Sequence, residues 1–97
     1  MNILGADIIM KQFIRKSDYE TTHSDDELIV LNTDESTVTK LNEQGGYCWS
    51  LLGEVQTVES LSKAIQQKYG SDTINKKSNI EVFLLKLMEY GLIKNVV

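Results

Sequence analysis

A chain of 97 residues with 41% hydrophobic and 25% charged residues has the composition of a globular protein, and we expect a single domain over residues 1–97. Its formal net charge of −4 disfavours contact with a phosphate backbone, so nucleic acid is not an expected partner. The sequence contains one cysteine, no signal peptide and no apolar run of about 20 residues. We therefore expect a cytoplasmic protein with no metal, no cofactor and no membrane partner.

Alternating apolar residues predict strands in the first half of the chain. A first strand is expected over residues 10–16, and the polar, acidic residues 17–26 are expected to form a loop. Residues 27–32 are apolar on both faces, which favours a central strand, and a four-residue hairpin loop leads to a return strand over residues 37–41. These three segments predict an antiparallel sheet with residues 37–41 on its edge.

After this sheet the apolar residues recur every three or four positions, which predicts helices. The first helix is expected over residues 42–52, with Asn42 as its N-cap and Gly53 as its stop. Cys48 and Trp49 lie on the expected buried face of this helix. Gly45 and its neighbour Gly46 do not belong to a phosphate-loop pattern and predict close helix packing.

Two further helices are predicted by their caps and their apolar faces. Thr57 is the expected N-cap of a helix that ends before Gly70, and Asp72 is the expected N-cap of a last helix over about 73–90. The core face of the last helix is expected to comprise Ile80, Phe83, Leu84, Leu87 and Met88, with Gly91 and Leu92 forming a Schellman ending and residues 93–97 a short extended tail. The sequence thus predicts an α+β fold, a three-stranded antiparallel β-sheet followed by three helices, with a winged helix-turn-helix-like arrangement.

The polar residues of the chain do not form a convincing catalytic set. His23 stands beside Ser24 and Asp25, but neighbours in sequence cannot all point at one another, so a solvated histidine is expected. Cys48 is expected to be a small core residue, because a reactive thiolate needs exposure and positive neighbours. We therefore expect a protein that is not an enzyme.

The expected edge strand over residues 37–41 carries no proline and a single lysine, so it is weakly protected against pairing with another chain. Such an edge can accept an extended peptide, with main-chain bonds for affinity and nearby pockets for specificity. The last helix carries additional apolar residues, Val82 and Leu85, which are expected to line a groove beside this strand. Two other interpretations stay open: a small winged-helix DNA-binding regulator, and a subunit that dimerises through the same edge.

Several short motifs, in a fixed order, resemble those of the PqqD family. They are Leu41-Asn42, Gly45, Trp49, Leu51-Leu52, Thr57-Val58, Leu61, Tyr69, Asn79-Ile80, Phe83-Leu84, Leu87 and Gly91-Leu92-Ile93, within residues 27–93. The Asp-Gly pair that usually follows the first helix in this family is replaced by Gly53-Glu54-Val55, and Asn79 stands where Asp is common. This family is the leader-recognition domain of pathways that modify ribosomally made peptides.

The resemblance implies a non-catalytic domain that binds the leader of a precursor peptide as an added strand. Carried over by position, the peptide-binding residues are Thr37, Val38, Thr39, Lys40 and Leu41 on the strand, and Asn79, Val82, Phe83, Leu85 and Lys86 on the last helix. A chain of this size looks most like the stand-alone leader-binding subunit of lasso peptide biosynthesis. Its implied partners are a precursor peptide and a separate modifying enzyme or leader peptidase. A peptide chaperone for a radical-SAM maturase is the alternative within the same family.

Overall fold

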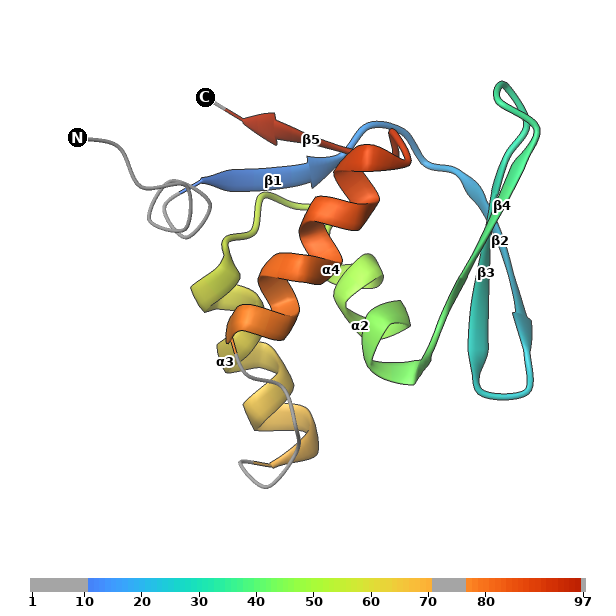
Figure 1. Cartoon of the computed structure of the whole chain (residues 1–97). Helices are drawn as coiled ribbons and strands as arrows, with labels where there is room; N and C mark the ends of the chain where they lie inside the picture. The colour runs from blue at the N-terminus through green and yellow to red at the C-terminus, as the bar shows by residue number, and fades with distance from the viewer. Residues whose placement is uncertain (1–10, 71–76, 97) are drawn as a thin grey trace.

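The computed structural model describes residues 11–70 and 77–96, and Figure 1 shows the arrangement of the elements. In chain order these elements are β1 (Gln12–Arg15), β2 (Glu20–Ser24), β3 (Glu27–Asn32), β4 (Thr37–Leu41), α2 (Glu43–Leu51), α3 (Val58–Tyr69), α4 (Lys77–Glu89) and β5 (Ile93–Val96). The three helices lie between a three-stranded sheet on one side and a pair of strands that crosses their upper end in the view. The predicted α+β class is confirmed.

The three-stranded sheet is antiparallel, and β3 lies between β2 and β4 as its apolar sequence predicts. Leu31 of β3 stands opposite Glu20 on one side and Val38 on the other. Leu28 and Val30 are buried, because alternate side chains of β3 turn toward the helices. The central position of residues 27–32, the hairpin that follows them and the edge position of residues 37–41 are all confirmed.

The strand on the other edge, β2, comes from residues that were predicted to be a loop. All five of its side chains are exposed, and they are the polar series Glu20, Thr21, Thr22, His23 and Ser24. A strand that buries no side chain leaves no apolar alternation in the sequence, and only its backbone pairing with β3 reveals it. The prediction of a loop over residues 17–26 is therefore wrong for its middle part.

The predicted first strand exists as β1, but its place in the sheet was predicted wrongly. It pairs antiparallel with β5 in a separate two-stranded sheet, where Phe13 is opposite Asn95. Phe13 also exchanges two backbone hydrogen bonds with Gln56, with N···O distances of 2.8 and 2.9 Å. Its ring is fully buried, so β1 covers the helices instead of extending the sheet. Its partner is the predicted C-terminal tail, about 80 residues further along the chain.

The caps that the sequence predicts are present at three helix ends. The Asn42 side chain accepts a hydrogen bond from the Gly45 N–H at 2.8 Å, and Thr57 forms a reciprocal capping box with Ser60. At the end of α4 the Leu92 N–H donates to the Leu87 carbonyl at 3.0 Å, and Gly91 has the positive φ of 75° that a Schellman ending requires. The expected N-cap of this helix, Asp72, lies outside the described residues.

The first helix ends directly before Gly53 as predicted, but Gly53 is not in the left-handed conformation of a C′ glycine. Helix α2 ends at Leu51 with Leu52 as its cap, and the glycines of positive φ in the described part of the chain are Gly70 and Gly91. A Cβ at Gly53 would lie 2.5 Å from the Arg15 Nη2. The Arg15 guanidinium occupies the space beside Gly53, so a larger residue here would displace the flexible end of that side chain.

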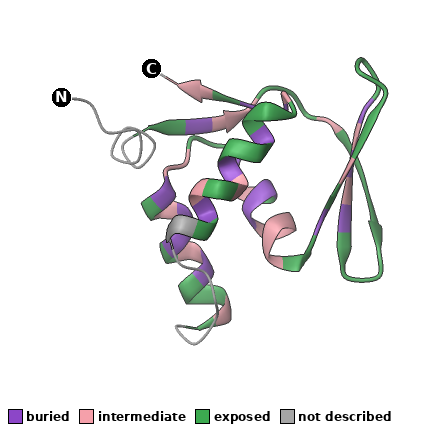
Figure 2. Ribbon diagram, in the orientation of Figure 1, coloured by how far each residue is buried: buried purple, intermediate pink, exposed green. Residues whose placement is uncertain are grey.

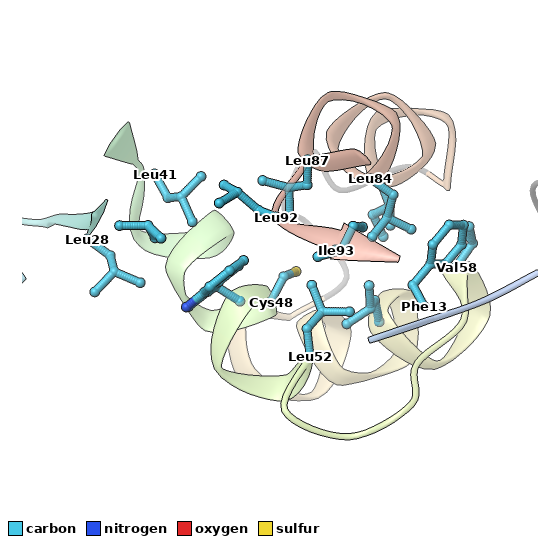
Figure 3. Packing of buried hydrophobic residues seen from close by; sticks show 14 of the residues in the cluster. Phe13, Leu28, Leu41, Cys48, Leu52, Val58, Leu84, Leu87, Leu92 and Ile93 are labelled. Carbon is cyan, nitrogen blue, oxygen red and sulfur yellow. The ribbon is translucent and has the colours of Figure 1, made fainter. Parts of the chain in front are cut away.

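The core lies where the helices meet β1, β5 and the inner face of the sheet. Figure 2 marks the buried residues along the ribbon, and Figure 3 shows the packing of their side chains. The members of the core include Phe13, Leu28, Leu41, Cys48, Trp49, Leu52, Val58, Leu61, Ile65, Ile80, Leu84, Leu87, Leu92 and Ile93. Cys48 is buried as predicted, and burial raises the pKa of its thiol from 9.0 to about 11. Met88, predicted to be in the core, is 37% exposed because it lies just beyond the buried arc of α4.

Candidate functional site

The open edge of the three-stranded sheet is the starting point of the site. Within the described residues β4 pairs with β3 on one side and has no strand on the other. Its last residue, Leu41, is buried and anchors the strand in the core, while Val38 is 62% exposed. The backbone groups on the outer side of this strand are therefore available for pairing with another chain.

A cavity of about 390 Å³ follows this edge along most of its length. Four of its lining residues are Thr37, Val38, Thr39 and Lys40 of β4, and the fifth is Tyr90, which follows the last turn of α4. Strand β4 is thus bordered by a side chain from a second element, and the Tyr90 ring provides an apolar surface next to the open backbone.

Two smaller cavities continue the first one toward α2. One of about 250 Å³ also contains Thr39, Lys40 and Tyr90, and it adds Leu41, Asn42, Phe83, Lys86 and Leu87. The next, of about 260 Å³, adjoins it through Asn42 and Phe83 and is also lined by Gln44, Gly45, Cys48, Ile65 and Asn79. We call these three connected cavities the β4–α4 groove.

The inner end of the β4–α4 groove depends on a glycine in the first turn of α2. A Cβ at Gly45 would lie 3.1 Å from the Asn42 Oδ1 and 3.3 Å from the Phe83 Cε1. A Cβ on the next residue, Gly46, would lie 3.2 Å from the Leu28 Cβ on the sheet. The close helix packing predicted for this glycine pair is confirmed, and at Gly45 it brings Phe83 of α4 against α2.

The structure brings most of the predicted site residues together in the groove. These are Thr37, Val38, Thr39, Lys40 and Leu41 on β4, and Asn79, Phe83 and Lys86 on α4. That these residues bind a peptide stays a prediction.

Two predicted residues, Val82 and Leu85, are not among the residues that line the groove. Both side chains are exposed, by 53% for Val82 and 51% for Leu85. Since each residue advances a helix by about 100°, Leu85 points about 200° away from Phe83. Leu85 therefore faces away from the β4 edge, whereas Val82 lies one turn before Lys86 on the same side of the helix, so its contact with a peptide stays a prediction.

Sequence reasoning missed Tyr90, which borders two of the three cavities. The signal was present, since Tyr90 follows Lys86 by four residues and Phe83 by seven, the spacing of a single helix face. Asn42 was also missed as a lining residue, because its role as a helix cap already explained its presence.

The charge on the groove differs in sign from that of the whole protein. The charged side chains that line the groove, as far as the described residues define it, are Lys40 and Lys86. The chain as a whole carries a net charge of −4. The groove therefore favours a guest with acidic side chains over the basic partner that the overall charge would attract.

A search of the described residues finds no group of three or more histidine, cysteine or acidic side chains arranged to hold a metal ion. Nor does any helix there have the length and apolar character needed to cross a membrane. The features that these described residues offer for binding are an unpaired strand edge and a groove lined by both polar and apolar side chains.

A family model described as coenzyme PQQ synthesis protein D (PqqD) matches residues 27–93. The chain belongs to the PqqD family. The matched region runs from β3 to the first residue of β5, so it contains both walls of the β4–α4 groove. The resemblance seen in the sequence motifs is thereby confirmed.

A solved structure similar to this PqqD-family chain is that of TbiB1 in complex with the TbiA(beta) leader peptide. The two chains share 26% sequence identity with a TM-score of 0.70, over 87% of this chain and 98% of the other. No match is found among curated proteins. The similar structure is thus a leader-peptide complex, and its length corresponds to that of most of this chain.

Proposed function

We propose that this chain binds the leader region of a ribosomally synthesised precursor peptide, which adds to the sheet as an antiparallel strand beside β4. The observation that carries the proposal is the open β4 edge with a connected groove along it. Five residues of β4 extend over roughly 17 Å, enough to pair with a short extended segment. Membership of the PqqD family and the likeness to a leader-peptide complex support the same function.

In this proposal the two walls of the groove have different tasks. The backbone of β4 gives affinity that depends little on the guest's sequence, and the pockets at Tyr90 and Phe83 select its side chains. Lys40 and Lys86 favour acidic residues in the guest. A short strand with one groove is a modest interface, for which we expect a Kd in the submicromolar to micromolar range, or about −8 to −9 kcal/mol.

The chain itself is proposed to be non-catalytic and to act in the cytoplasm, where ribosomal products are made. It holds the precursor and presents it to a separate modifying enzyme or leader peptidase, raising the local concentration of substrate there. Lasso peptide biosynthesis is the pathway we favour, and the likeness to TbiB1 in complex with the TbiA(beta) leader peptide, over 98% of that chain, supports it. A chaperone for a radical-SAM maturase would use the same groove, and the genes that neighbour this one distinguish the two pathways.

The test is a titration of the cognate leader peptide, followed by isothermal calorimetry, with a series of peptides each N-methylated at one backbone position. In an antiparallel pair only alternate guest residues exchange hydrogen bonds with β4. We therefore expect binding to weaken about tenfold at every second position of the paired segment and to change little at the positions between. A uniform response along the peptide, or no binding of the unmodified leader, would contradict strand addition.

The interpretation as a self-pairing subunit is tested in the same samples. If two copies pair through β4, the mass in solution doubles with concentration and the leader peptide dissociates the dimer. A monomer at all concentrations that still binds the leader supports the peptide-binding function.

A further inference from the structure

A second cavity, of about 390 Å³, lies on the other side of α2 from the groove. Its volume is within the roughly 300–1,000 Å³ that small-molecule sites span. The rings of Tyr47 and Tyr69 line it, and they meet edge to face, with ring centres 6.1 Å apart and an interplanar angle of 83°. We call it the Tyr47–Tyr69 cavity.

The chain places one of its own cations against this aromatic pair. The Lys68 Nζ lies 5.0 Å from the centre of the Tyr47 ring and 5.6 Å from that of Tyr69, both within the range of cation–π attraction. Lys68 is itself exposed on the surface. An exposed lysine that lies over two rings can be displaced by another cation without unfolding the protein.

The remaining charges around the cavity are mostly acidic. Asp25 and Asp26 come from the β2–β3 turn, and Glu43 from the first turn of α2. The Tyr69 hydroxyl lies 3.5 Å from the Glu43 Oε2. Desolvation and the nearby Glu43 carboxylate raise the pKa of the Tyr69 hydroxyl. Aromatic faces with carboxylates around them are a suitable environment for an ammonium or guanidinium group.

The cavity is also continuous with the proposed peptide site. Asn42 lines both the Tyr47–Tyr69 cavity and the inner part of the β4–α4 groove, so the two meet at the start of α2. A peptide that continues past the Leu41 end of β4 reaches this point. There it leaves a groove with two lysines and meets a cavity with three carboxylates, which is a change of sign within one binding surface.

We propose that the Tyr47–Tyr69 cavity binds a lysine or arginine side chain of the guest peptide, from the part that extends past the Leu41 end of β4. The incoming cation replaces Lys68 over the two rings and is neutralised by Asp25, Asp26 and Glu43. The inference rests on the proposed function, which it deepens. Opposite charge preferences in the groove and in the cavity then fix the direction and register of a strand that main-chain bonds alone leave free to slide.

The first experiment needs no precursor peptide. The ¹⁵N-labelled chain is titrated with Nα-acetyl-arginine methylamide and, as a neutral control of the same shape, Nα-acetyl-citrulline methylamide. We expect arginine to shift the amide signals of Gly46, Tyr47 and Tyr69 with a Kd of about 1–10 mM, and citrulline to leave them unchanged. Equal shifts with both compounds, or none with arginine at about 50 mM, would overturn the proposal.

The decisive variant is Lys68→Gln, which removes the internal cation from an exposed position. If Lys68 competes for the rings, this variant binds the arginine probe about threefold to tenfold more tightly, whereas a purely structural lysine would give equal or weaker binding. Tyr69→Leu is expected to remove the response, and Lys63→Gln, an exposed lysine elsewhere on α3, is the control for net charge.

The second experiment assigns the cation to the guest. Each lysine or arginine of the cognate leader on the Leu41 side of the paired segment is replaced by glutamine, and one replacement is expected to weaken binding about threefold to tenfold. In the Tyr69→Leu chain the same replacement has no effect. If the probe binds but no replacement matters, the guest peptide is not the occupant. If the leader does not bind at all, the proposed function fails while the probe titration still reports on the cavity.

Discussion

As far as residues 11–70 and 77–96 show, the two outer strands of the three-stranded sheet, β2 and β4, are both open edges, but they have different neighbours. All five residues of β2 are described and exposed, and none of them belongs to the buried core. Strand β4 is anchored by Leu41 and bordered by Phe83 and Tyr90 from the α4 region. In the proposed function, the wall that Phe83 and Tyr90 form along β4 is what distinguishes this edge from β2 as a peptide site.

The largest effect is expected from prolines placed in both edge strands, which test directly whether leader binding depends on β4 and not on β2. Successive N–H groups of an edge strand point alternately to the neighbouring strand and to the open side. Of Val38→Pro and Thr39→Pro, the one that removes an outward donor is expected to weaken leader binding at least about 100-fold, or about 2.7 kcal/mol. The loss combines a missing ladder bond with a ring that obstructs the incoming strand. Calorimetric titration of the leader measures it.

The matched controls are Thr21→Pro and Thr22→Pro in β2, which make the same change on the other edge of the sheet. We expect the variant with the outward substitution to change leader affinity less than about threefold. Circular dichroism melting separates the variants that disturb pairing with β3, because those also unfold at lower temperature. If prolines in β2 and β4 weaken binding equally, the guest does not distinguish the two edges and the groove has no role.

The same comparison explains how much of the fold could be predicted from the sequence. Strand β3 and the helix caps at Asn42 and Thr57 have local patterns, and these predictions are confirmed. Strand β2 has none, because a strand with no buried side chain is recognisable only by its pairing. The partner of β1 was equally hidden, since β5 lies at the far end of the chain. Local sequence thus predicts elements better than it predicts which elements pair.

The candidate site was also predicted from local sequence patterns, which located the strand edge but not every side chain beside it. The open β4 edge follows from the apolar character of β3, and the structure confirms its position. On α4 the prediction selected Val82 and Leu85 for their apolar character and overlooked Tyr90. The rotation of each residue about the helix axis decides which side chain borders β4, and this needs the position of the helix relative to the sheet.

The anchoring of β4 can be tested through the core it shares with Cys48. Burial raises the pKa of this thiol in the folded state from 9.0 to about 11. Because the pKa of the thiol is higher in the folded state than in the unfolded chain, this difference contributes to the free energy of unfolding. The contribution is fully present below pH 9 and is lost as the pH rises from 9 to 11. Two pKa units correspond to about 2 to 3 kcal/mol of unfolding free energy.

Urea unfolding followed by circular dichroism between pH 8 and 11 measures this loss. Lysines and tyrosines titrate in the same range, so the Cys48→Ala variant is needed to isolate the effect of the thiol. Between pH 8 and 11 the unfolding free energy of this variant should decrease by about 2 to 3 kcal/mol less than that of the original chain. The leader affinity of the original chain should decline once the core is weakened, since Leu41 and Cys48 lie in one cluster. Parallel pH curves for the two chains would mean that the thiolate is tolerated in the core.

The smallest of the three effects concerns the wall of the groove, and two residues of equal exposure form a matched pair. Tyr90 and Leu85 are 50% and 51% exposed, but only Tyr90 is among the residues that line the groove along β4. Tyr90→Ala is expected to weaken leader binding about tenfold, or about 1.4 kcal/mol, because a guest covers its ring. Leu85→Ala should change the affinity less than about twofold, because its side chain faces away from the guest.

Both substitutions remove exposed side chains, so neither should alter the melting temperature by more than a few degrees. Tyr90→Phe keeps the ring and is expected to retain most of the affinity, which attributes the effect to apolar contact and not to the hydroxyl. If Leu85→Ala weakens binding as much as Tyr90→Ala does, the guest runs along the outer face of α4. The open edge of β4 would then be no more of a peptide site than that of β2.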